Sequence, residues 1–225
     1  MTLSILAQLE ALAEPGRAEQ MTAYHKQSRR VIGIANPVLN DLAKTWRQSL
    51  PLEERIALAR DLWDSDVFEA RIAAGKVLTQ ARIKADAPVW DLLQSWVPDF
   101  DSWAIADHAC SAIQKRLLAD PLRLDQVEEW TRSDHMWTRR AALVATLPWA
   151  KMNNLKPADQ ASRSRILGWA AGYVADRDWF IQKAVAWWLR DLSKHDAEAT
   201  RSFLAQHGPQ MKPFARKEAG KYLKT

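Results

Sequence analysis

The sequence predicts an all-α protein, and three observations point to this class. Only 7 of the 225 residues are glycine, and alternating β-branched runs are few. Apolar residues recur at spacings of three and four, as in Leu52, Ile56, Ala59 and Leu62, which places them on one face of a helix. With 48% hydrophobic and 26% charged residues, the composition is that of an ordinary folded globular chain.

Prolines mark where several of the predicted helices begin. Pro37 follows Asn36, Pro51 follows a serine–leucine pair, and Pro121 follows Asp120. Proline suits the first turn of a helix because its missing N–H has no partner to lose there. We therefore expect helices to start close to residues 37, 51 and 121.

Four segments of the chain resemble one another, and each places an aromatic residue after a short turn that contains an acid. They are "DVFEARIAAGKVL" (66–78), "FDSWAIADHACSAI" (100–113), "DHMWTRRAALVATL" (134–147) and "DRDWFIQKAVAWWL" (176–189). The aligned aromatics lie 35, 34 and 43 residues apart: Phe68, Trp103, Trp137 and Phe180. This period is the size of one helical pair in an α-solenoid. We expect residues 87–97 and 122–131 to supply partner helices, and residues 1–225 to form one domain of irregular HEAT-like repeats.

One position departs from the repeat pattern. Four residues after the aromatic, three of the segments have a small or apolar residue, but the segment of Trp103 has Asp107. An uncompensated carboxylate at a buried position costs several kcal/mol or shifts its pKa. The acid therefore has either a structural cation partner, such as Arg71 or Arg140 of the adjacent repeats, or a function. Trp103 lies one turn before Asp107, on the same face of the helix.

Cations recur one residue before that position in the other repeats: Arg71, Arg140 and Lys183. In a solenoid, residues at one register line one strip, so these side chains would form a concave cationic groove able to hold phosphates. The net charge of +5 agrees with a polyanionic partner. Further cations would extend the strip at its two ends: Lys26, Arg29 and Arg30 at one, Arg216, Lys217 and Lys221 at the other.

Several other classes of protein are disfavoured. No apolar run is long enough for a membrane span, and the N-terminal residues do not have the pattern of a signal peptide. The single cysteine, Cys110, allows neither an internal disulfide nor a cysteine-based zinc site. The five histidines are scattered, and no catalytic triad or glycine-rich phosphate loop is present. We expect a soluble, cytoplasmic protein without a metal or other cofactor.

The 12 tryptophans are expected to serve mainly in packing. Those assigned to the core or to contacts between repeats are Trp46, Trp63, Trp90, Trp96, Trp130 and Trp149. Trp187 and Trp188 are adjacent and lie about 100° apart on a helix, so one can pack while the other faces a groove. Spacing does not decide which of the two is exposed.

The chain resembles the AlkD-like DNA alkylation-repair glycosylases, which are built from HEAT-like repeats. The similar segments follow the family's order over most of the length: Tyr24-x-Lys26 with "GIANPVLNDL", "LWDSDVFEARIAA", Trp103-x-x-x-Asp107, "SDHMWTRRAALV", "WFIQKAVAWWLRD" and "FARKEAGKYL". The resemblance implies a monomeric hydrolase of base excision repair. It would release N3-methyladenine and N7-methylguanine from alkylated duplex DNA.

The resemblance also implies roles for individual residues. It places the catalytic aspartate at Asp107 and its aromatic neighbours at Trp103 and Trp187. It assigns DNA contacts to Tyr24 and Arg140, to which the repeat pattern adds Arg71 and Lys183 and the extension of the strip adds Lys26. A single carboxylate suits this reaction because an N3- or N7-alkylated purine is already cationic and leaves without a general acid.

Two other functions remain open from the sequence. A relative without catalytic activity would use the same fold and cations to bind DNA of unusual shape. A HEAT-type protein scaffold would use the fold but would not need the recurring cations. Asp107 distinguishes the first of these from an enzyme, because an anion in a phosphate-binding groove repels DNA.

Overall fold

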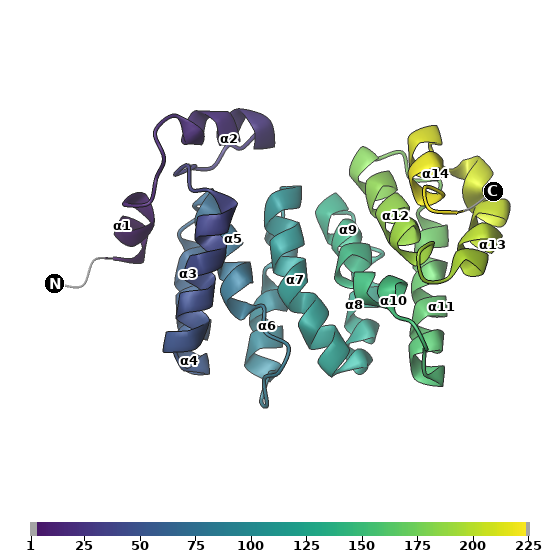
Figure 1. The fold of residues 1–225 in the computed structure, drawn as a ribbon, viewed down its shortest axis with the longest axis horizontal. Helices are drawn as coiled ribbons and strands as arrows, with labels where there is room; N and C mark the ends of the chain where they lie inside the picture. Colours follow the sequence, from purple (N-terminus) through teal and green to yellow (C-terminus); the bar gives the residue numbers. More distant parts are fainter. Residues whose placement is uncertain (1–3, 224–225) are drawn as a thin grey trace. The chain divides into compact units, whose positions relative to one another are not determined.

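The computed structural model describes residues 4–223, and every regular element within that range is a helix (Figure 1). The predicted all-α class is confirmed. The chain divides into two compact units, one ending at Ala119 and the other beginning at Asp120. Among the helices of this range, none combines the length and the apolar character needed to cross a bilayer.

The N-terminal unit has two layers of helices. Helix α5 packs against α3, α4 and α7, while α6 packs against α4 and α7, so that α3, α5 and α7 form one layer and α4 and α6 the other. Helix α2 lies crosswise near the ends of α3 and α5 (Figure 1). The helices are α1 (Ile5–Glu10), α2 (Arg17–His25), α3 (Asn36–Ser49), α4 (Leu52–Asp64), α5 (Phe68–Leu78), α6 (Ala87–Ser95), the 3₁₀ helix Val97–Asp99 and α7 (Trp103–Ala119).

The C-terminal unit is organised around α12. This helix packs against α9, α10, α13 and α14, and α9 also contacts α8, α10 and α11. The helices are the 3₁₀ helix Pro121–Arg123, α8 (Leu124–Trp130), α9 (Met136–Ala145), α10 (Leu147–Lys151), α11 (Pro157–Gly172), α12 (Trp179–Leu192), α13 (Ala197–His207), the 3₁₀ helix Gly208–Gln210 and α14 (Pro213–Ala219).

The repeat alignment corresponds to the helices. Phe68 and Trp103 are the first residues of α5 and α7, and Trp137 and Phe180 are the second residues of α9 and α12. The segments expected to supply partner helices are α6 and α8. The predicted starts also agree, since α3 begins at Asn36, α4 at Leu52 and a 3₁₀ helix at Pro121.

A fully buried carboxylate fixes the segment between α2 and α3. Glu69 on α5 accepts hydrogen bonds from three consecutive backbone N–H groups: Ile32 at 2.9 Å, Gly33 at 2.6 Å and Ile34 at 3.2 Å. Gly33 has φ of 92°, and a Cβ built there would lie 2.7 Å from the backbone nitrogen of Ala18. Glycine is required because both the conformation and the close approach exclude a side chain.

Helices α5 and α7 approach closely at Gly75. A Cβ at this position would lie 2.9 Å from the backbone nitrogen of Ala109 and from the carbonyl of His108. The fully buried Arg116 adds a polar connection, because its Nη1 lies 2.7 Å from Asp86 and its Nη2 donates to the Ala81 carbonyl at 3.0 Å. These contacts set the position of α7 relative to α5.

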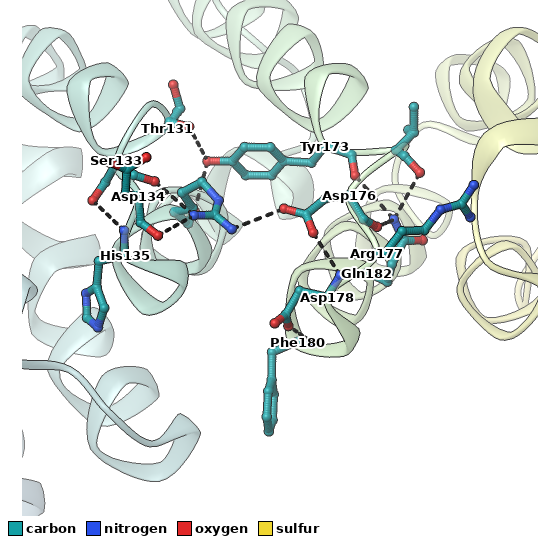
Figure 2. A network of polar contacts seen from close by, with 12 residues as sticks. Thr131, Ser133, Asp134, His135, Tyr173, Asp176, Arg177, Asp178, Phe180 and Gln182 are labelled. Carbon is teal, nitrogen blue, oxygen red and sulfur yellow. Dashed lines mark hydrogen bonds and ion pairs between the residues drawn. The ribbon is translucent and has the colours of Figure 1, made fainter.

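A polar network fixes the turn before α12 (Figure 2). The Tyr173 hydroxyl lies 3.2 Å from the Thr131 carbonyl oxygen and 3.1 Å from that of Arg139. The buried Gln182 amide nitrogen lies within 3.2 Å of the carbonyl oxygens of residues 173, 174 and 176. Because the network joins the ends of α8, α9 and α11 to α12, the first turn of α12 is held in a defined place.

The tryptophan predictions hold with one exception. Of the six residues assigned to packing, Trp46 is half-buried, and the other five are buried. Trp63 and Trp96 stack with their ring centroids 4.4 Å apart and their planes within 6°. Trp188 is fully buried and its indole nitrogen lies 3.3 Å from the Thr146 carbonyl oxygen, whereas Trp187 is half-buried.

Replacing the anchoring carboxylate by its amide is expected to destabilise the N-terminal unit. In Glu69→Gln one of the two acceptor oxygens becomes an NH2 group that faces backbone donors, so buried N–H groups lose their partners. We expect the free energy of unfolding to fall by about 2–4 kcal/mol, measured by urea denaturation. Glu53→Gln, the same change at an exposed position of α4, should alter it by less than about 0.5 kcal/mol. Equal effects in the two variants would contradict the anchoring role.

Candidate functional site

Trp103 and Asp107 lie on the first two turns of α7. The helix begins here because the Ser102 carbonyl accepts the Ala106 N–H and its hydroxyl accepts the Ile105 N–H at 3.4 Å. Asp107 is half-buried. The equivalent residues of the other repeats are all buried, as the sequence pattern predicted: Ile72, Ala141 and Ala184. The structure therefore places a carboxylate where the sister repeats have core residues.

Aromatic rings from α2 and α5 surround Trp103. The ring of His25 lies between Phe68 and Trp103, with centroid distances of 4.8 Å and 5.0 Å. The ring of Tyr24 meets Trp103 edge to face at 6.2 Å and remains 72% exposed. The unit thus brings Tyr24 to the residue that precedes Asp107 by one helical turn.

His25 is a member of this cluster that sequence reasoning missed. Burial lowers the pKa of His25 below its ordinary value, and the nearby Glu69 carboxylate raises it by less. The imidazole is therefore neutral at pH 7 and acts as an aromatic spacer. Lys26, the next residue, ends α2 in a left-handed conformation with φ of 52°, and its side chain is exposed.

The cations that recur in the repeats lie against tryptophan rings. Arg71 is 8% exposed, with its guanidinium carbon 4.6 Å from the Trp63 centroid, and its Nη2 pairs with Asp66 at 3.0 Å. Arg140 is 5% exposed and lies 5.7 Å from the Trp137 centroid. These contacts give both arginines a role in packing, and DNA contact by either remains a prediction.

Lys183 and Trp187 lie on α12 in the C-terminal unit. Lys183 is half-buried, with its Nζ 5.4 Å from the Trp179 ring centroid. The Trp187 indole N–H donates to the buried carboxylate of Asp191 at 3.1 Å, and Asp191 also pairs with Lys151 at 3.3 Å. Trp187 is thus held in a fixed orientation by its own helix.

A polar pocket of about 460 Å³ lies on the layer formed by α3, α5 and α7. Its lining includes Ser111, one turn after Asp107 on α7, and the Ser111 hydroxyl donates to the backbone carbonyl of Asp107 at 2.9 Å. The Nδ1 of His108 donates to the Ala104 carbonyl at 2.8 Å, and burial lowers the pKa of this imidazole. The lining includes Lys44, Arg47, Lys76, His108 and Ser111, with Asp41 as its single acid.

Lys76 is the cation of this pocket that responds to pH. Burial, and then the neighbouring Arg47 guanidinium, lower the pKa of Lys76 to about 8. Arg47 donates from Nη1 to the Lys76 carbonyl at 2.6 Å, which holds the two cations together. Sequence reasoning missed both. The repeat alignment already pairs Lys76 with Ser111, and this pairing is the signal that could have drawn attention to this face.

Within residues 4–223 there is no group of three or more His, Cys, Asp or Glu side chains placed to hold a metal ion.

Comparisons with known proteins identify the family. The family model for the DNA alkylation repair enzyme matches residues 5–223. The chain belongs to this family. Membership indicates a protein of DNA alkylation repair or DNA binding.

Solved structures agree on the fold. A protein of Enterococcus faecalis, described as a predicted DNA alkylation repair enzyme, has a TM-score of 0.76 at 21% identity, covering 95% of this chain and 97% of that one. AlkD2 from Streptococcus mutans has a TM-score of 0.64 at 20% identity, covering 98% of both chains. A protein related to the HEAT-like repeat DNA glycosylases, with affinity for branched DNA structures, has a TM-score of 0.68 at 15% identity, covering 97% and 92%. Comparison with curated protein sequences finds no match.

These neighbours confirm the HEAT-like repeat fold that the sequence predicts. The cationic groove and the single-domain organisation stay predictions, as do the cytoplasmic location and the monomeric state.

Proposed function

We propose that this member of the DNA alkylation repair family is a DNA glycosylase that hydrolyses the N-glycosidic bond of N3- and N7-alkylated purines in duplex DNA. The observation that carries the proposal is Asp107, a half-buried carboxylate at a position where the sister repeats are apolar. It lies one turn after Trp103, which is itself surrounded by Tyr24 and His25.

The chemistry follows from the charge of the substrate. The alkylated purine carries a positive charge and departs as a neutral base, so positive charge develops on the deoxyribose as the bond breaks. The Asp107 carboxylate would stabilise that charge and orient the attacking water. The face of the Trp103 ring offers electron density to a cation. Trp187 and Arg140 are assigned to the reaction and to DNA binding by the resemblance alone.

The polar pocket beside Asp107 would hold a phosphate of the bound strand. Arg47, Lys76 and Lys44 contribute three cations to one wall, against the single acid Asp41. Such an arrangement favours a phosphodiester. The proposed surface therefore combines a carboxylate for the sugar with cations for the backbone next to it.

The Asp107 carboxylate is expected to be required for base release. Asp107→Asn should lower the release of 7-methylguanine and 3-methyladenine from methylated duplex DNA by at least about 100-fold. Affinity for undamaged duplex should stay equal or increase, because a negative charge is removed from a DNA-binding surface. Free bases are measured by chromatography, with spontaneous release subtracted.

Asp91→Asn supplies the matched control, since Asp91 is exposed on α6. Release by this variant should equal that of the unaltered protein. If the unaltered protein releases no base above the spontaneous rate, the glycosylase proposal fails. If it does release base and Asp107→Asn is equally active, another residue is the catalytic acid.

The affinity of the pocket for DNA is expected to depend on pH through Lys76. Lys76 has a pKa of about 8, so it is charged at pH 7 and loses its proton as the pH rises to 9. Affinity for duplex DNA should therefore fall by up to about tenfold over this interval. In Lys76→Arg the cation stays charged, and the fall should disappear.

The groups that face Lys76 do not confound this measurement. Lys76→Arg leaves the other charged and titratable groups of the lining unchanged, so any response of theirs to pH appears equally in both proteins: Asp41, Lys44, Arg47 and His108. Affinities are measured by fluorescence anisotropy at constant salt. Identical pH profiles for the unaltered protein and Lys76→Arg would refute a role for Lys76.

A second candidate function is supported by one of the neighbours. The structure of the protein with affinity for branched DNA aligns with 97% of this chain. A binder of this kind would prefer a four-way junction to a linear duplex of equal length, and would release no alkylated base. Competition between the two DNAs, run beside the release assay, separates this candidate from the glycosylase.

A further inference from the structure

An exposed indole marks the start of α12. Trp179 is the first residue of that helix and is 50% exposed. Its ring stacks on Phe214 of α14, with centroids 6.0 Å apart and planes at 28°, and meets the edge of Phe180 at 5.0 Å. The Nζ of Lys183 lies 5.4 Å from the indole centroid. One part of the ring is therefore supported by protein while half of the side chain's surface stays open to solvent.

The polar network before α12 makes this arrangement rigid. The Asp178 carboxylate accepts the Phe180 N–H at 2.7 Å, and the Asp176 carboxylate accepts the Asp178 N–H at 2.8 Å (Figure 2). The amide oxygen of the buried Gln182, Oε1, accepts a hydrogen bond from the backbone N–H of Lys212 at 3.0 Å. This last bond connects α12 to the residue before α14, and so fixes Phe214 next to Trp179.

A basic pocket of about 600 Å³ lies next to this pair: the Phe214 ring lines it, and so does Lys183, whose Nζ lies 5.4 Å from the Trp179 centroid. Three lysines and the Phe214 ring line it: Lys183, Lys217 and Lys221. Its acid, Glu218, forms an ion pair with Arg190, which balances that negative charge. The volume lies within the range of small-molecule sites and is sufficient for a nucleotide. The pocket combines an apolar wall with uncompensated positive charge.

We propose that the Trp179–Phe214 pair and this lysine pocket bind an unpaired nucleotide of DNA. The base would stack on the open face of Trp179, and the adjoining phosphates would contact Lys183, Lys217 and Lys221. Aromatic faces next to cations are the means by which proteins bind single-stranded nucleic acid. In an intact duplex the bases cover one another's faces, so a nucleotide in a tail, a gap or a junction is the one that can stack.

This inference rests on the DNA binding of the proposed function and adds a substrate feature to it. An acidic peptide would satisfy the lysines equally well but would not need the indole. The inference therefore commits to a ligand that has both a flat ring and a phosphate. Lysines alone would recognise only the phosphate.

The test uses unmodified DNA and the full chain. The probes are a blunt duplex, the same duplex with a single-stranded thymidine tail, and the same duplex with a tail of abasic sites. The unaltered protein should bind the thymidine tail about tenfold more tightly than the blunt end, and the abasic tail should give a much smaller gain. Equal affinity for the two tails would overturn stacking and leave only a cationic surface.

Two variants locate the effect. Trp179→Leu should remove the preference for the thymidine tail over the abasic tail, and Trp179→Phe should retain part of it. Lys217→Gln should weaken binding to both tails, whereas Lys156→Gln, the same change at an exposed position outside the pocket, should not. Circular dichroism verifies that each variant is folded. A full thymidine preference in a folded Trp179→Leu protein would refute the inference.

The readout is independent of base release. A protein that releases no alkylated purine but prefers the thymidine tail would refute the glycosylase proposal and support this one. Release of alkylated purine without a preference for the thymidine tail would support the glycosylase proposal and refute this inference.

Discussion

The buried carboxylate of Glu69 accepts three consecutive backbone N–H groups, and the N-terminal unit depends on this one interaction for its candidate site. The bonds hold the segment that follows α2 against α5. Because that segment is fixed, the end of α2 reaches the first turns of α5 and α7, and Tyr24 and His25 pack on Trp103. An exposed aromatic is thereby placed near the turn that carries Asp107, without any direct bond to it.

Local patterns in the sequence were sufficient to identify the structural features shared by the four aligned segments. The aligned aromatics coincide with the starts of α5, α7, α9 and α12, because each of these helices begins after a turn of the same kind. The sequence alone also indicated that Asp107 is an unusual residue at its position of the repeat. Helical periodicity predicts that the equivalent residues of the other repeats are buried, and they are: Ile72, Ala141 and Ala184. Choosing Trp188 as the buried member of its pair needed packing partners from other helices, among them Thr146, which follows α9.

The exposure and the neighbours of the cations were not predictable from their register. Arg71 and Arg140 share a register with Lys183, which suggested three equivalent phosphate contacts. In the structure the two arginines are buried against Trp63 and Trp137, and Lys183 is the more accessible. Similarly, nothing in the local pattern around Lys76 reveals Arg47, which comes from α3 and helps to lower its pKa. Periodicity identifies the face of a helix but not the neighbours that it meets.

Under the proposed function Asp107 would lie on a DNA-binding surface, where its negative charge has to be offset. An isolated acid there would repel phosphate and reduce affinity. The pocket lined in part by His108 and Ser111 of α7 holds an excess of cations, which would offset that repulsion. The neighbouring imidazoles, His25 and His108, have lowered pKa values and add no charge at pH 7. In the proposed function, α7 therefore presents the Asp107 carboxylate to a cationic sugar intermediate and contributes His108 and Ser111 to a pocket whose cations would hold the neighbouring phosphates.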